Sequence, residues 1–327
     1  MSASAEPKAA SGLPVVAGAA GAAGAAEAAR RPTPARERFG TLVEGWLRGH
    51  TILIYLFLYI PIIVVVIFSF NATNRRVTDW QGFSLKWYAS VLSDKVVQSA
   101  LANSLIVATS TAIISAVFGT MAALGLQRAP KWFRRPFEAL TFVSIIVPEI
   151  VIALASLVFF SSSFDILNPI FGLKLKLGFP TIIAAHALFN ISLVMLLVRA
   201  RLSGMDRTHV EASYDLFATP WRTFWQITFP QLLPAVVAGF LLSFTFSFDD
   251  YVITTFVSGA GSTTLPLYVF GTIRKGVTPA TNAVAAVMLL ITLTILVVGQ
   301  LVVARNARRA GGRSAATVAE MITEQSG

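Results

Sequence analysis

The sequence contains no cysteine, which excludes disulfide frameworks, thiolate metal sites and cysteine nucleophiles. Charged residues are also scarce: they make up 13% of the chain, about half the share that is usual in soluble proteins. No Gly-x-x-x-x-Gly-Lys-Ser/Thr phosphate loop occurs, so we expect this chain alone neither to bind nor to hydrolyse ATP in the usual way. These absences turn attention from soluble enzymes to the membrane.

Histidine is rare as well, with three residues in the chain. Only His186 lies in a strongly apolar run, and no Gly-x-Ser-x-Gly elbow accompanies it, which argues against an intramembrane serine protease. His186 and Asn190 stand four positions apart and would share one helix face. A metal site is not expected there, because no second histidine lies in an apolar run. Interhelical hydrogen bonding is the default interpretation of the pair.

Apolar residues are abundant, at 55% of the chain, and the mean hydropathy is +0.70. As a helix, each of six apolar runs is long enough to cross the roughly 30 Å hydrocarbon core of a bilayer. These runs are residues 52–70, 100–126, 137–160, 179–198, 232–258 and 282–304. The sequence therefore predicts an all-α polytopic membrane protein with six transmembrane helices in a domain of residues 49–304. Residues 1–48, rich in Ala, Gly and Pro, are predicted to be a disordered tail, and residues 305–327 a second tail.

Positive charge indicates the orientation of these helices, because Lys and Arg are retained in cytoplasmic loops. Eighteen of the 26 Lys and Arg residues lie in the two tails and in the loops after the second and fourth runs, against eight in the other loops. Both termini are therefore predicted to be cytoplasmic. The same distribution accounts for the net charge of +10 without a nucleic-acid partner.

The segment 211–230, between the fourth and fifth runs, carries an informative motif. It reads Glu211-Ala212-Ser213, three residues, Phe217, nine residues and then Ile227-Thr228-Phe229-Pro230. We expect a cytoplasmic platform that another protein grips. The spacing resembles the "EAA" loop of permease subunits of bacterial ABC importers, which reads Glu-Ala-Ala, three residues, Gly, nine residues and Ile-x-Leu-Pro.

This resemblance implies that the loop, residues 199–231, couples the chain to an ATPase subunit. Glu211 would pair with a basic residue of the ATPase, and Ala212 and Ser213 would let the two surfaces approach closely. An alternative for Glu211 is a solvated carboxylate at a helix start, where the helix dipole favours it. Phe217 replaces the family glycine, so it adopts either an ordinary helical conformation or a strained one with positive φ. The residues assigned to coupling are Glu211, Ala212, Ser213, Asp215, Phe217 and Pro230.

Two adjacent carboxylates, Asp249 and Asp250, interrupt the fifth run. An Asp at the centre of a transmembrane helix costs roughly 2.5 to 3.5 kcal/mol on insertion scales, so it usually faces a cavity, a partner or a pathway. On a continuous helix Asp250 would share one narrow face with small and polar residues, and Asp249 would lie roughly 100° away. That face would be either a close helix-helix seam or the wall of a hydrated solute path. Its residues are Gly239, Ser243, Ser247, Asp250, Thr254 and Ser258.

Glu149 follows Pro148 in the middle of the third run. Proline removes a backbone donor and tends to kink a helix, so this carboxyl should lie near a break in the hydrogen-bond ladder. Two interpretations are open: a second pathway anion, or a buried and protonated carboxyl that holds the kink.

A further resemblance narrows the family. The stretch that begins Ser247-Phe248-Asp249-Asp250-Tyr251, with Thr263-Thr264-Leu265-Pro266-Leu267 and Gly276-Val277-Thr278-Pro279, is similar to the spermidine/putrescine importer permeases, in particular the subunit usually encoded second of the pair. Ala260 departs from the proline that those permeases often have. The resemblance implies a polyamine path with carboxylates and aromatic walls, which attract ammonium groups. Its residues would be Asp250, Asp249, Tyr251, Ser247 and Glu149.

The resemblance also implies a mechanism of alternating access in the bacterial cytoplasmic (inner) membrane. A homologous permease subunit would pack beside this chain, two ATPase subunits would bind ATP and Mg, and an extracytoplasmic solute-binding protein would deliver the polyamine. The chain itself would be no enzyme and would need no cofactor, and it would contact membrane lipids but no nucleic acid. The alternatives are a permease for another small solute, such as an amino acid, a thiamine-like cation or chelated iron, and a non-transporting membrane scaffold.

Overall fold

A computed structural model describes residues 34–324 with the exception of residues 75, 76 and 78. The regular structure of these residues is helical, and the one β-bridge among them joins Asn71 to Phe83. Six helical segments among them are long and apolar enough to cross a membrane, as the sequence predicts. The chain divides into two compact units, Met1–Val64 and Val65–Gly327.

The first unit contains most of helix α2, Pro34–Ser69, whose apolar part Val43–Ser69 matches the first predicted span. Residues 1–33 of the predicted disordered tail lie outside the described residues. At 34–48 that prediction is corrected, because α2 already begins at Pro34. Proline is well tolerated in the first turn of a helix, and the Ala, Arg, Glu and Leu residues that follow have high helix propensity.

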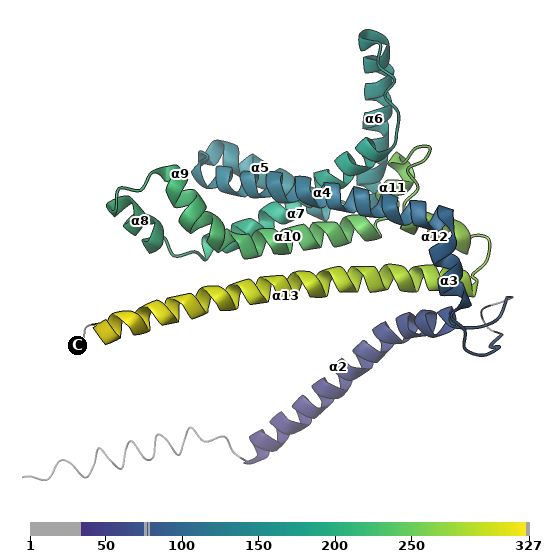
Figure 1. Ribbon diagram of the computed structural model, residues 1–327, viewed down its shortest axis with the longest axis horizontal. Coiled ribbons are helices and arrows are strands. Elements are labelled where there is room, and N and C mark those ends of the chain that lie inside the picture. Colours follow the sequence, from purple (N-terminus) through teal and green to yellow (C-terminus); the bar gives the residue numbers. More distant parts are fainter. Residues whose placement is uncertain (1–33, 75–76, 78, 325–327) are drawn as a thin grey trace, which may run out of the picture. The chain divides into compact units, whose positions relative to one another are not determined.

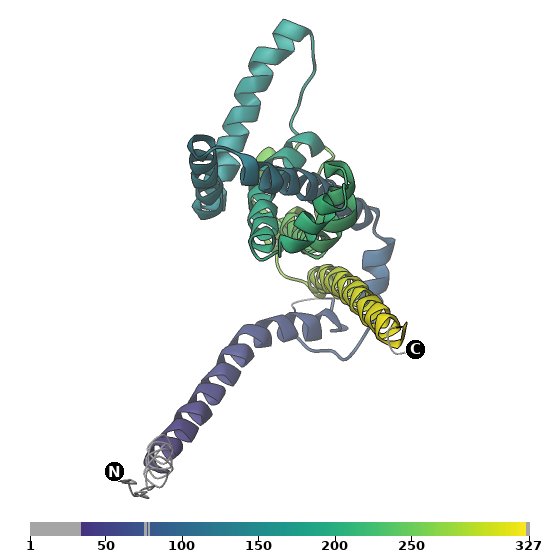
Figure 2. The same cartoon turned by 90° about the vertical axis from the view of Figure 1, so that its left-hand side faces the viewer.

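Three long helices form the centre of the second unit: α4 (Lys95–Arg128), α7 (Phe179–Ser203) and α10 (Phe229–Asp249) pack against one another (Figure 1, Figure 2). Their close approach depends on glycine. A β carbon at Gly119 of α4 would lie 2.8 Å from Val194 Cβ of α7, and one at Gly239 of α10 would lie 3.0 Å from Val194 Cγ1. A larger residue at either position would push α7 away. The small-residue face of α10 is therefore a close helix-helix contact at Gly239.

Further helices pack on α7. Helix α5 (Lys131–Ile146) packs on α7, and α11 (Val252–Val257) packs on α7 and on α6 (Glu149–Phe171). Figure 1 and Figure 2 show α6 extending away from the three central helices.

The third apolar run is interrupted at Val147 and Pro148, between α5 and α6. Pro148 has no backbone N–H to continue the ladder, and the break that the sequence predicts there is confirmed. The predicted span of residues 137–160 is wrong in its position, because the segment that is long and apolar enough to cross a membrane is Glu149–Phe171.

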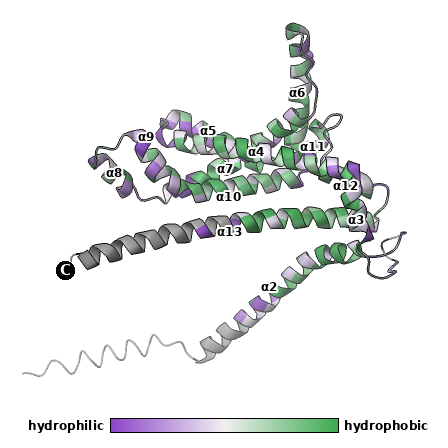
Figure 3. Cartoon of the chain, in the orientation of Figure 1, coloured by the Kyte–Doolittle hydropathy of each residue, from purple (hydrophilic) through white to green (hydrophobic). Residues whose placement is uncertain are grey.

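Helix α13 (Pro279–Glu324) packs along α10 and also contacts α3 (Lys86–Ser93) and α12 (Leu265–Ile273). It continues past the predicted end of the sixth run at residue 304, through Ala, Arg and Glu residues that favour helix. In Figure 1, α3 and α12 lie at one end of the second unit, and α8 (Thr208–Asp215) and α9 (Pro220–Thr223) lie at the other. Figure 3 shows hydrophilic residues on α8 and α9 and mainly apolar residues along α10.

The fifth apolar run is also interrupted, at Asp250 and Tyr251 between α10 and α11. Asp250 has an extended backbone, with φ −66° and ψ 129°. Its carboxylate accepts hydrogen bonds from the backbone N–H of Ile253 at 3.2 Å and of Thr254 at 2.8 Å. The prediction of one continuous helix through residue 258 is therefore wrong, because these local bonds compete with the helical ladder and start a new helix.

Candidate functional site

Four side chains form a buried polar cluster: His186 of α7, Ser247 of α10, Asp250 between α10 and α11, and Thr254 of α11. His186 Nε2 lies 2.9 Å from Asp250 Oδ2, and His186 Nδ1 lies 2.7 Å from Ser247 Oγ. The Thr254 hydroxyl donates to Asp250 Oδ2 at 2.8 Å. Because a buried charge without partners is unstable, these bonds explain how the fold accommodates Asp250, which is only 8% exposed.

The sequence singles out Asp250, Ser247 and His186 but does not connect them. The predicted interhelical hydrogen bonding of the His186 and Asn190 pair is confirmed for His186 alone. The Asn190 side-chain amide instead donates to the carbonyl of His186 in its own helix, at 2.9 Å. Polar residues in different apolar runs are expected to seek each other, but the sequence does not indicate which ones meet.

Glu149 approaches the cluster from the first turn of α6. Its carboxyl lies beside that of Asp250, close enough for a direct interaction, and unlike Asp250 it is exposed in this chain. The structure thus brings together three of the residues predicted to line a path, which are Glu149, Ser247 and Asp250.

The other two predicted pathway residues point elsewhere. The Asp249 side chain interacts with the hydroxyl of Thr292 in α13. The ring of Tyr251 stacks on Phe270 of α12, with 3.9 Å between ring centroids and 16° between planes, and Arg274 Nη2 lies 3.5 Å from the Tyr251 hydroxyl. The five residues therefore do not form a single wall within this chain.

A second candidate site is the platform, residues 208–230, which contains α8, α9, a π-helix (Phe224–Thr228) and the start of α10. Ser213 Oγ of α8 lies 2.9 Å from Thr223 Oγ1 of α9, and both residues are buried. The Thr219 hydroxyl caps α9 by accepting from the Arg222 N–H. Bonds between residues close in sequence thus set the shape of the platform. Of the predicted coupling residues, Ser213 is buried, and the exposed ones are Glu211, Ala212, Asp215, Phe217 and Pro230.

The sequence leaves two backbone conformations open for Phe217, an ordinary helical one and a strained one with positive φ. In the structure, Phe217 has the strained one. Its φ is +58°, and it is the one non-glycine residue with positive φ in the described part of the chain. A left-handed conformation costs a residue with a β carbon roughly 1–2 kcal/mol. The Phe217 side chain is 95% exposed, beside the exposed Leu216 and Trp221. The turn between α8 and α9 therefore presents an apolar surface.

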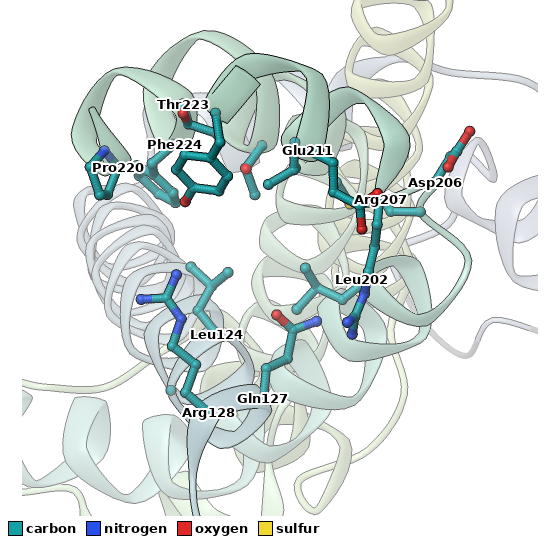
Figure 4. Close-up of a pocket in the computed structure, with 15 residues that line it drawn as sticks. Leu124, Gln127, Arg128, Leu202, Asp206, Arg207, Glu211, Pro220, Thr223 and Phe224 are labelled. Carbon is teal, nitrogen blue, oxygen red and sulfur yellow. The ribbon is translucent and has the colours of Figure 1, made fainter. Parts of the chain in front are cut away.

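Glu211 lines a cavity of about 590 Å³ beneath the platform (Figure 4). Figure 4 shows Gln127 and Arg128 of α4 and Arg207 around the same cavity. Glu211 has no ion-pair partner among the residues that the structure describes. Arg128 and Arg207 line the same cavity without forming a direct ion pair with Glu211.

The Asp206 side chain hydrogen-bonds Thr208, the first residue of α8. Its Oδ1 accepts from the Thr208 hydroxyl at 2.6 Å and from the Thr208 N–H at 2.9 Å. These hydrogen bonds to the charged form hold the pKa of the Asp206 carboxyl below its usual value. Asp206 was not singled out from the sequence, although Asp two positions before a helical Thr is a recognisable local turn.

Groups that could ligate a metal are not clustered in the described part of the chain. No set of three or more His, Asp or Glu residues among the described residues could hold a metal ion.

Comparison with known proteins identifies the family. Residues 115–312 match the family described as "Binding-protein-dependent transport system inner membrane component", a stretch that includes both the buried polar cluster and the platform. The chain belongs to this family of ABC-importer permeases. It is accordingly a multi-pass membrane subunit of a kind whose ATPase is a separate subunit.

Several relatives in the permease family have names that specify a solute. The chain is 39% identical over 237 residues to the putrescine transport system permease protein PotI of Escherichia coli (strain K12), covering 72% of this chain and 82% of PotI. It is 34% identical over 264 residues to the spermidine/putrescine transport system permease protein PotC of the same organism, covering 80% of this chain and 94% of PotC. PotC of Haemophilus influenzae is 35% identical over 253 residues, which is 77% of this chain and 94% of that protein.

Solved structures confirm the permease fold. A bacterial ABC transporter involved in the import of the acidic polysaccharide alginate aligns with a TM-score of 0.68 over 82% of this chain and 96% of its own, at 13% identity. The alginate transporter in complex with a pentasaccharide-bound periplasmic protein aligns with a TM-score of 0.64 over 80% of this chain and 93% of its own, at 14% identity. At such low identity the likeness concerns the fold alone.

Proposed function

We propose that this permease moves polyamines into the cytoplasm as one subunit of an ATP-driven importer. The observation that carries the proposal is the 34–39% identity to PotI and PotC over 72–80% of the chain. Polyamines are chains of ammonium groups separated by methylenes, so a path for them should combine carboxylates with apolar and aromatic walls. The residues around the buried polar cluster have this character.

Glu149, Ser247 and Asp250, which lie together, would line one stretch of the path, and Asp249 and Tyr251, whose side chains turn toward α13 and α12, would line it elsewhere. Glu149 offers an exposed carboxyl beside the buried Asp250, which is the arrangement expected where a cation passes the membrane interior. The stacked rings of Tyr251 and Phe270 offer a surface for cation-π attraction. Such a site need bind only weakly, because a separate solute-binding protein would supply affinity.

The platform would couple this movement to ATP hydrolysis. Glu211 would pair with a basic residue of a partner ATPase, the small side chain of Ala212 would let the two surfaces approach closely, and the buried Ser213 would hold α8 against α9 behind them. Asp215, Phe217 and Pro230 would complete the surface. The exposed Glu211, which has no direct ion-pair partner among the described residues, and the exposed apolar turn at Phe217 support this role, since both are features that a docked partner would cover.

The complete importer would contain a homologous permease subunit, two ATPase subunits that bind ATP and Mg, and an extracytoplasmic solute-binding protein. This chain would need no cofactor of its own and would catalyse no reaction. Both termini and the platform would face the cytoplasm, as the distribution of Lys and Arg indicates. The chain would lie in the bacterial inner membrane in contact with lipids.

Uptake of radiolabelled putrescine and spermidine by cells that carry this chain with its neighbouring-gene partners tests the proposal. We expect uptake of at least one polyamine, and we expect Glu211→Ala to abolish it without loss of the permease from the membrane. Glu44→Ala is the matched control, because Glu44 is an exposed carboxylate outside the platform.

Two results would separate the alternatives. An assembled complex with ATPase activity but without polyamine uptake would reject polyamines and favour an amino acid, a thiamine-like cation or chelated iron. Absence of uptake of any of these solutes, with full assembly, would indicate a non-transporting scaffold.

A further inference from the structure

Four buried oxygen atoms where α4, α7 and α10 meet have no hydrogen-bond partner among the residues that the structure describes. They are Thr111 Oγ1 and Ser115 Oγ of α4, Asn190 Oδ1 of α7 and Ser243 Oγ of α10. The three hydroxyl residues are 0% exposed and Asn190 is 2% exposed, so the surroundings of the protein do not reach these atoms. A buried polar atom without a partner is costly, and such atoms usually bond to an internal water or ion.

Two contacts mark successive levels in this three-helix centre. At the glycine level, β carbons at Gly119 of α4 and Gly239 of α10 would lie 2.8 Å and 3.0 Å from side-chain atoms of Val194 in α7. At the histidine level, His186 Nδ1 of α7 lies 2.7 Å from Ser247 Oγ of α10. Along α7 and along α10 alike, the two levels are separated by eight positions, which is about two helical turns.

Three of the unpartnered atoms lie in one layer between these levels. Asn190 and Ser243 are each four positions, or about one turn, from both levels in their own helices. Ser115 is one turn from the glycine level along α4, toward Ala112, which belongs to one buried core cluster with Phe244. Helices α4, α7 and α10 thus each bring an unpartnered oxygen atom to the same layer.

The groups in this layer suit a water molecule. Asn190 Oδ1 can only accept a hydrogen bond, whereas a serine hydroxyl can donate or accept. A buried water typically makes two to four hydrogen bonds to polar groups that would otherwise lack a partner. A cation such as Ca²⁺ suits the layer less well, because it takes roughly six to eight oxygen ligands, including carboxylates. The four atoms here, counting Thr111 at the histidine level, are fewer and carry no charge.

We propose that the three-helix centre binds an ordered water molecule through Asn190 Oδ1, Ser243 Oγ and Ser115 Oγ. This water extends the buried polar cluster by one layer toward the platform end of α10. The Asn190 amide also donates to the carbonyl of His186 at 2.9 Å, so the water holds the opposite end of a side chain that already contacts the cluster. The site is independent of which solute the permease moves.

A cryo-electron microscopy map of the assembled importer that resolves buried waters tests the site directly. We expect density about 3 Å from both Asn190 Oδ1 and Ser243 Oγ. A map without this density, or with the serine hydroxyls turned onto carbonyls of their own helices, would overturn the proposal.

A double-mutant cycle on the full-length permease tests the same site by its energetics. Ser115→Ala and Ser243→Ala each remove one hydroxyl and keep the rest of the side chain. In a detergent unfolding titration, we expect each to raise the unfolding equilibrium constant roughly 2- to 12-fold, the range of a single hydrogen bond. We expect the double variant to raise it by less than the product of the two single effects, because both hydroxyls bind one water.

This coupling is informative because the two hydroxyls do not bond to each other in the structure, so a group between them has to transmit it. Ser161→Ala is the matched control, since Ser161 is exposed on α6, and it should leave the unfolding constant unchanged. Strictly multiplicative effects would overturn the proposal. A lower unfolding constant for Ser243→Ala would also overturn it, because removal of a dry and unpartnered hydroxyl stabilises a core.

Discussion

The platform and the buried polar cluster are both polar regions of a mostly apolar chain, but they are built in opposite ways. The platform is formed by residues within about twenty positions of one another, and its internal bonds, such as Ser213 to Thr223, join neighbours in sequence. The cluster joins α7 to the α10–α11 junction, with Glu149 added from α6. The platform can therefore be identified from the spacing of a sequence motif. The buried polar cluster cannot, because it forms only when helices that are distant in the sequence pack together.

Substitutions in the two regions should also differ in their energetic effect. The platform exposes most of its predicted coupling residues, so their substitution should change docking more than folding. The cluster is buried, and each polar atom in it depends on a partner from another helix or loop. We therefore expect changes at long-range contacts to have the larger effects.

The largest effect is expected where two distant loops approach most closely. A β carbon at Gly259 would lie 1.9 Å from the carbonyl oxygen of Leu177, so Gly259→Ala cannot be accommodated without movement of the backbone. We expect the amount of folded permease in the membrane to fall severely, as measured by size-exclusion chromatography in detergent. Gly271→Ala is the matched control, since a β carbon at Gly271 would meet nothing within 4 Å. A stable Gly259→Ala protein would contradict the importance of this contact.

The next largest effect is expected at the cluster itself. Asp250→Asn replaces a carboxylate oxygen, which accepts hydrogen bonds, by an amide group whose hydrogens point at the same donors. We expect this mismatch to cost about 1–3 kcal/mol of free energy, which corresponds to a factor of roughly 5 to 150 in an equilibrium constant. We expect polyamine uptake to fall at least about tenfold, within that range, with the complex still assembled. Asp165→Asn, an exposed position on α6, should keep wild-type uptake. Wild-type uptake by Asp250→Asn would show that the buried carboxylate has no part in transport.

A smaller effect of opposite sign is expected on the platform. Phe217→Gly relieves a left-handed backbone at a side chain that is 95% exposed, so we expect the free permease to gain about 1 kcal/mol of stability. Thermal unfolding of the detergent-solubilised chain measures this change. Leu216→Gly, at an exposed neighbour with negative φ, should instead lower stability. If Phe217→Gly unfolds at a lower temperature, the ring makes stabilising contacts that its exposure does not suggest.

The smallest effect is expected at the entry to α8. The pKa of Asp206 is lowered in the folded chain by its bonds to Thr208, so this carboxylate stabilises the fold above its ordinary value of 3.8 and loses that contribution as pH falls through the lower folded value. At neutral pH, Asp206→Ala should therefore speed hydrogen exchange of the first amides of α8. Exchange in α9 serves as the internal control. Unchanged exchange in α8 would show that the turn does not depend on this carboxylate.

Several features of this protein follow directly from the order of its amino acids. The apolar runs specify six spans because a helix that crosses a bilayer must satisfy its backbone internally and expose apolar side chains. Pro148 favours the break after α5 because proline cannot donate to the ladder, although Pro61 is accommodated inside α2. The spacing from Glu211 to Pro230 specifies the platform, because its contacts are local.

The roles of the polar residues in the spans depend instead on how the helices pack. The periodicity of the fifth run predicts one helix with Asp250 on a continuous face, but the Asp250 side chain satisfies the N–H groups of α11 and ends α10. The meeting of Asp250 with His186 could not be read from either run, because the two residues are brought together by the packing of α7 against α10 and α11. Local bonds can be inferred from neighbours in the chain, whereas the partner of a buried charge is chosen by which helices touch.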